Sequence, residues 1–87
     1  MVRAKFKVVE VRRMMSSKEV KVEGQRSTWV PCEMQTIKLS PVSSGSEENK
    51  KFWQATPSGS IELGIINEEG WKGFELNGEY YVDFTKA

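Results

Sequence analysis

The chain has 87 residues, of which 38% are hydrophobic, and it carries 13 Lys or Arg, 12 Asp or Glu and no histidine. This length fits one domain with a thin core, and no apolar run approaches the ~18 residues that a membrane span needs. Without histidine, and with Cys32 as the single cysteine, the usual zinc ligands, internal disulfides and histidine-based catalysis are excluded. We therefore expect a non-enzymatic protein of the reducing cytoplasm that uses no metal or cofactor and contacts no membrane.

The first third of the sequence predicts strands. Residues 3–13 alternate apolar and charged side chains with a change of parity at Val8 and Val9, which indicates a strand with a bulge or sharp bend. Residues 14–27 are less regular, and Val20 and Val22 indicate a short second strand. The two methionines of this stretch, Met14 and Met15, are compatible both with core filling and with an adaptable partner surface.

The alternation resumes at Thr28, changes phase at Ile37 and ends at Pro41. Pro31 interrupts this run, and a proline cannot donate a hydrogen bond to a central ladder. The run therefore predicts an edge strand or an irregular arm.

Short helices and two further strands are expected in the second half. Ser46 followed by two glutamates is typical of a helix N-cap and predicts a helix over residues 47–55, stopped by the turn at residues 56–59. Asn67 is expected to cap one helical turn. The alternating patterns and the Asn77-Gly78 turn signal predict strands on either side of that turn. The core is expected to contain Phe6, Val8, Trp53, Ile61, Leu63, Ile65, Tyr80, Val82 and Phe84.

About five strands, one short helix and one helical turn indicate a mostly β fold. Two architectures fit this count: a small, partly open barrel of the OB type, or a curled antiparallel sheet with one short helix. We predict a single β-barrel-like domain over residues 1–87, with an inserted ribbon or loop at about residues 14–35.

Several segments taken together resemble a family of small bacteriophage proteins. They are R-A-K-F-K-V at residues 3–8, S-E-E-N-K at 46–50, T-P-S-G-S at 56–60 and Y-Y-V-D-F-T at 80–85. The resemblance implies a phage product acting in the cytoplasm of the bacterial host, and it implies no catalytic residues. Members of the family join the first strand to the segment at residues 36–42 by a shorter link, so residues 14–35 stand out as the insert.

The insert is where we expect function, since loops carry binding residues more often than core strands do. Basic side chains that follow a backbone, combined with an aromatic platform, are what single-stranded nucleic acid binding requires. The competing interpretation is an ordinary solvated hairpin with Trp29 folded onto the barrel. The candidate binding residues in the insert and elsewhere are Arg12, Arg13, Lys18, Lys21, Arg26, Trp29, Lys50, Trp71 and Tyr81.

The charges of the chain bear on the choice of partner. Residues 1–45 contain nine Lys or Arg and four Glu, a net charge of +5, whereas residues 46–87 contain four Lys and eight Asp or Glu, a net charge of −4. A basic N-terminal half suits nucleic acid or a nucleotide. The alternative is a host protein, such as an antiviral defence effector that the chain blocks, or sequestration of a signalling nucleotide between subunits. The oligomeric state is open, and a homodimer is one of the options.

Overall fold

The computed structural model describes residues 2–54 and 58–87, so Ala55, Thr56 and Pro57, where the expected helix ends and its turn begins, lie outside the described residues. Four described strands form one antiparallel sheet in the order β3-β2-β1-β4. The elements are β1 (Val2–Val20), β2 (Thr28–Pro41), α1 (Glu47–Phe52), β3 (Ile61–Ile65), α2 (Glu68–Trp71) and β4 (Glu79–Phe84).

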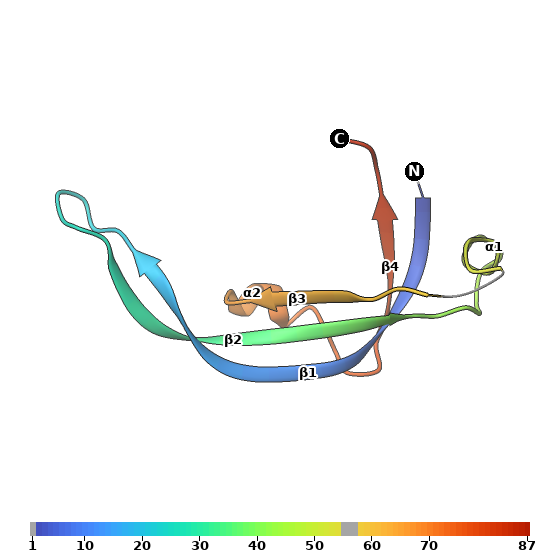
Figure 1. Ribbon diagram of the computed structural model, residues 1–87, viewed down its shortest axis with the longest axis horizontal. Helices are drawn as coiled ribbons and strands as arrows, with labels where there is room; N and C mark the ends of the chain where they lie inside the picture. The colour runs from blue at the N-terminus through green and yellow to red at the C-terminus, as the bar shows by residue number, and fades with distance from the viewer. Residues whose placement is uncertain (1, 55–57) are drawn as a thin grey trace.

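A long, curved β1–β2 hairpin is the frame of the molecule (Figure 1). β4 pairs with β1 over residues 2–7, and β3 pairs with β2 over residues 35–39. Residues 13–34 comprise the far ends of β1 and β2 and their turn, where the two strands have no other strand partner among the described residues; we call this two-stranded part the arm. The rest is the body. The radius of gyration is 17.0 Å, against about 12 Å for a compact domain of this length, because the arm projects from the body.

The curled antiparallel sheet is confirmed, and the barrel alternative is wrong. β3 and β4 lie at opposite edges of the described sheet and do not pair with each other, so the sheet stays open. The expectation of five strands is also wrong. β1 continues without interruption through Val20, and Val22 lies just before the turn of the hairpin, so the two strands expected there are one.

The two faces of the sheet differ in polarity. A register shift between Val8 and Glu10 confirms the predicted bulge, and it keeps apolar side chains on the same face of β1 when their parity changes. Val8 lies opposite Leu39, and Val11 lies opposite Ile37. We call the face that carries these side chains the apolar face and the opposite one the polar face.

The core lies on the apolar face of the body, although it is smaller than expected. Its buried members are Ala4, Phe6, Val8, Ile37, Leu39 and Trp53. Ile61, Ile65, Phe74, Tyr80 and Val82 pack against them and are half-buried. The prediction is wrong for Leu63 and Phe84, which are 37% and 51% exposed. Both lie on the predicted face, opposite Ile37 and Val2, but nothing among the described residues covers that face completely.

Helix α1 confirms its predicted cap: Ser46 Oγ accepts a hydrogen bond from the Asn49 N–H at 3.3 Å. Asn49 itself is fully buried. Its Oδ1 accepts from the Lys5 N–H at 2.6 Å, and its Nδ2 donates to the carbonyls of Val42 and, at 2.8 Å, of Ser44. Beyond the end of β2, the Val42 N–H donates to the Lys5 carbonyl at 3.0 Å. The Asn49 amide bridges the Lys5 N–H and the Val42 carbonyl, and so satisfies the backbone where the strand pairing ends.

The connection from β3 to β4 also follows the predicted local signals. Asn67 caps α2 through a bond from the Glu69 N–H at 3.0 Å, and Asn77 adopts a φ of 70° in the turn before β4. Phe74 packs against the Tyr80 ring with a centroid distance of 5.3 Å. The Tyr80 hydroxyl accepts a bond from the Glu75 N–H at 2.9 Å. None of the helices in the described ranges is long and apolar enough to cross a membrane.

Candidate functional site

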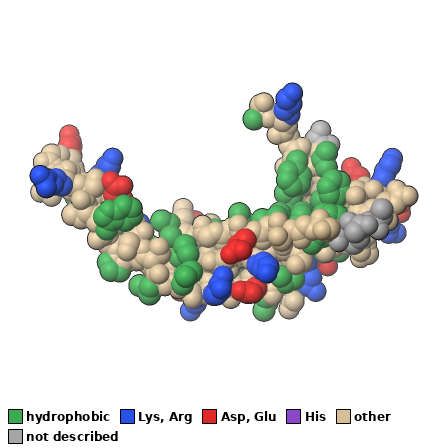
Figure 2. Space-filling view, in the orientation of Figure 1, with side chains coloured by type: hydrophobic (Ala, Val, Ile, Leu, Met, Phe, Trp, Pro, Cys, Tyr) green, Lys and Arg blue, Asp and Glu red, His purple; other side chains and the backbone are tan. Residues whose placement is uncertain are grey.

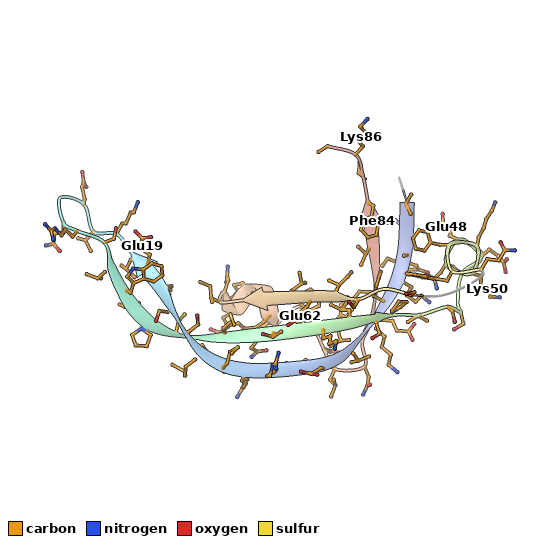
Figure 3. The ribbon with its side chains drawn as sticks, in the orientation of Figure 1. Glu19, Glu48, Lys50, Glu62, Phe84 and Lys86 are labelled. Atoms are coloured by element: carbon orange, nitrogen blue, oxygen red, sulfur yellow. The ribbon has the colours of Figure 1, made fainter. Side chains whose placement is uncertain are left out.

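The predicted binding residues do not form one site. Arg13, Lys18, Lys21, Arg26 and Trp29 lie on the arm or its turn, with Arg12 at the base, whereas Lys50, Trp71 and Tyr81 lie in the body. Figure 3 shows Glu19 of the arm and Lys50 of α1 at opposite ends of a molecule whose longest dimension is 55 Å. We therefore treat the arm and the body as separate candidate surfaces.

Two of the three body residues have local partners, and the third is half-buried. Lys50 forms an ion pair with Glu47 in the preceding turn of α1 at 3.6 Å. Trp71 is half-buried at the end of α2. Tyr81 lies on the polar face between two cations, because the guanidinium of Arg3 is 5.2 Å and the Lys5 Nζ is 5.4 Å from its ring centroid. Its ring is thus already engaged in cation–π contacts.

The same part of the polar face holds the best-aligned ion pair of the sheet. Arg3 lies opposite Asp83, and its Nε and Nη2 donate to the two carboxylate oxygens at 2.6 and 3.1 Å. The hydrogen bond from Arg3 lowers the pKa of the Asp83 carboxyl, and the same bond raises the pKa of Arg3. Both side chains are substantially exposed, so the pair orders the edge of the sheet without adding much stability.

The arginines at the base of the arm are ion-paired as well. Arg13 Nε lies 3.2 Å from Glu33 Oε1, and Arg12 contacts Glu10 and Glu62, each at 3.8 Å. Residues 13–34 contain four Lys or Arg and three Glu, a net charge of only +1. The arm is therefore only weakly basic, and the two arginines at its base are paired with glutamates.

The arm also separates the two components of the expected nucleic acid platform. Trp29 lies opposite Glu19, whereas Lys18 lies opposite Val30, and successive strand residues point to opposite faces. The indole and the Lys18 ammonium thus occupy different sides of the ribbon. Lys21 and Arg26 lie in the turn at the tip and are in no ion pair within residues 2–54 and 58–87.

Exposed apolar side chains are the main feature of the arm. No residue from 9 through 34 is buried, and Met15 and Trp29 are 72% and 68% exposed on the face that continues the apolar face of the body. Met14 is exposed on the other side. A shallow hollow of about 220 Å³ at the base of the arm is lined by Arg13, Met14, Met15 and Glu33. Of the two uses that the sequence allows for the methionines, core filling is wrong.

Sequence reasoning missed a second apolar surface, in the body. An open groove of about 450 Å³ lies on the apolar face between β3 and β4. Its lining comprises the apolar side chains of Leu39, Ile61, Leu63, Phe74, Tyr80 and Val82, together with Tyr81 and Asp83 of β4. The parity of β3 and β4 identifies most of these positions, but parity alone treats them as core, because it does not show whether a second layer covers them.

Comparisons with protein-family models, with curated proteins and with solved structures find no match to this chain.

Proposed function

We propose that this chain is a non-enzymatic binding protein that engages another protein through its arm. The observation that carries the proposal is the exposure of Met15 and Trp29 on a ribbon with almost no net charge. Methionine and tryptophan are enriched at protein interfaces, where methionine adapts to irregular surfaces and tryptophan supplies a large buried area. Within residues 2–54 and 58–87, the outer edges of both arm strands are also unpaired, and a partner strand can add to them.

Binding of a partner would stabilise the arm. Two strands without a covering layer are only marginally stable in water, since they bury little apolar surface to offset the entropy of ordering the backbone. A partner that covers Met15 and Trp29 supplies the missing burial. We infer from the resemblance to phage proteins that the partner is a protein of the bacterial host, and that binding blocks an antiviral defence effector in the cytoplasm.

Binding of single-stranded nucleic acid is the second candidate. The observation in its favour is the group of cations near the tip, Lys18, Lys21 and Arg26, which are in no ion pair within the described residues. It is the weaker candidate, because Lys18 and Trp29 lie on opposite faces and Arg12 and Arg13 are paired with glutamates.

Affinity capture from host lysate, with and without nuclease, tests these alternatives. We compare the parent with a Met15→Ser, Trp29→Ser variant and, as the control for a lost exposed apolar side chain outside the arm, with Leu76→Ser. A protein binder retains one stoichiometric protein after nuclease, keeps it in Leu76→Ser and loses it in the arm variant. Retention of that protein by the arm variant would contradict the proposal.

Charge reversal at the tip of the arm distinguishes binding of nucleic acid from binding of a protein. In a Lys18→Glu, Lys21→Glu, Arg26→Glu variant, a nucleic acid binder weakens on every sequence, and the salt dependence of its affinity becomes shallower. A protein binder that uses Met15 and Trp29 retains its complex, with changes mainly in the association rate. Salt-sensitive binding of oligonucleotides that depends on these three cations would favour nucleic acid over protein.

A further inference from the structure

The apolar face of the body lacks a covering layer. A sheet with one apolar face is stable when a second sheet or a layer of helices packs on it. Here α1 contributes Trp53, whose ring meets Phe6 edge-on at 5.7 Å, and Phe74 packs near Tyr80, but the groove between these two contacts stays open. Figure 2 shows hydrophobic side chains gathered on the right of the molecule, where Figure 1 places β4 and the start of β1.

Every charged side chain on the strands of the body lies on the other face. Pairing of the described strands places Lys5 opposite Tyr81, Lys7 opposite Glu79 and Lys38 opposite Glu62, all on the polar face. The apolar face carries one strongly polar strand side chain, Gln35, opposite Ile65. Asp83 also lines the groove, but its carboxylate is bonded to Arg3 on the polar face. A face whose own strand side chains carry no charge can pack against an identical face, because a two-fold axis then brings no like charges together.

The chain exposes more surface than a compact monomer of its mass. The chain exposes 6664 Å², against about 5,200 Å² for a folded monomer of its mass. The excess of about 1,500 Å² is shared by the extended arm and the open face, and a standard interface takes about 800 Å² from each partner. The apolar face is uncovered as soon as a single chain folds. A partner that covers it must therefore be present wherever the chain is synthesised. A second copy of the chain is always present there.

We propose that a second copy of this chain covers the apolar face of the body, in a two-fold, face-to-face dimer. Two sheets packed in this way, about 10 Å apart, form a β-sandwich in which each copy supplies one layer. Leu63, Phe84 and the groove become the interior of the dimer. The partner proposed above uses Met15 and Trp29 of the arm, so the dimer goes beyond that function and uses different residues.

Sedimentation equilibrium of the full chain is the first test. The parent is expected at twice 9.9 kDa, dissociating on dilution. Leu63→Glu is expected to weaken dimerisation more than about a hundredfold, since the two-fold axis buries two unpaired carboxylates. The matched control is Leu76→Glu, which changes a 58% exposed leucine in the turn before β4 and should keep the parent's dissociation constant. Circular dichroism verifies that both variants stay folded.

A parent that is monomeric at millimolar concentration, or a Leu63→Glu variant that dimerises as tightly as the parent, would overturn the proposal. So would equal weakening by the two glutamate variants. A second measurement needs no variant: isotope-filtered NMR on a mixture of differently labelled copies. It should show intermolecular contacts of Leu63 and Phe84. If the intermolecular contacts come from the arm or the polar face instead, the proposed face is wrong.

Discussion

The body and the arm belong to the same two long strands, yet they are held in place by different forces. In the body, β1 and β2 have neighbours on both sides, and Ile37 and Val8 are completely buried. In the arm the same strands keep their ladder but bury no side chain at all. The comparison shows that period-two alternation predicts where a strand runs, whereas burial depends on what packs against it.

The largest expected difference concerns core truncation. Ile37→Ala should lower the free energy of unfolding by about 2–5 kcal/mol, because it removes buried methyl groups and leaves a cavity. Met15→Ala should change it by no more than about 0.5 kcal/mol, since that side chain is 72% exposed. Urea denaturation of both variants at one protein concentration makes the measurement. Equal losses would mean that the arm is packed as tightly as the body.

A smaller loss of unfolding free energy is expected when the hydrogen bonds of the buried Asn49 side chain are removed. Asn49→Ala removes the partners of the Lys5 N–H and of the Val42 and Ser44 carbonyls, and should cost about 2–4 kcal/mol. Asn67→Ala, which removes only an exposed cap, is the control and should cost about 1 kcal/mol. Thermal melts monitored by circular dichroism compare the two. A loss at Asn49 no larger than that at Asn67 would mean that water replaces the lost bonds.

Shortening the arm should hardly change stability. Met15 and Glu33 are paired, so Asn-Gly in place of residues 16–32 closes the hairpin with a two-residue turn. The body keeps all its buried residues, and we expect a change in the free energy of unfolding below about 1 kcal/mol, together with loss of the arm's partner. Calorimetry measures the first and affinity capture the second. A short-arm variant that fails to fold would show that the arm is part of the body's folding unit.

The smallest expected effect is the pH dependence of the stability that the Arg3–Asp83 pair contributes. The pKa of Asp83 is lowered by its bond from Arg3, so the stabilisation from the pair is present at neutral pH and lost as pH falls through that lowered pKa. Asp83→Asn should melt slightly below the parent at neutral pH, and the difference should vanish at strongly acidic pH. Melting temperatures of both proteins across that range provide the measurement. A difference independent of pH would show that the carboxylate charge is not what stabilises the pair.

The candidate site was only partly predictable from the sequence. An edge strand or irregular arm around Pro31 follows from local signals, because a proline cannot donate to a central ladder. The exposure of Trp29 does not follow, since the same sequence is compatible with an indole folded onto the body. The pairing of Arg13 with Glu33 does not follow, since it depends on the register of two strands. The register brings Arg13 next to Glu33 and places Lys18 on the face opposite Trp29.

The sequence by itself determined the local features: the bulge after Val8, the caps at Ser46 and Asn67, and the turn at Asn77. Each depends on the backbone preferences and hydrogen bonds of a few neighbouring residues. The tertiary structure alone decided that the sheet stays open, that Asn49 satisfies the backbone where the strand pairing ends, and that Leu63 and Phe84 are exposed in the single chain. These outcomes depend on contacts between segments far apart in the chain, and alternation along a strand defines a face without specifying what covers it.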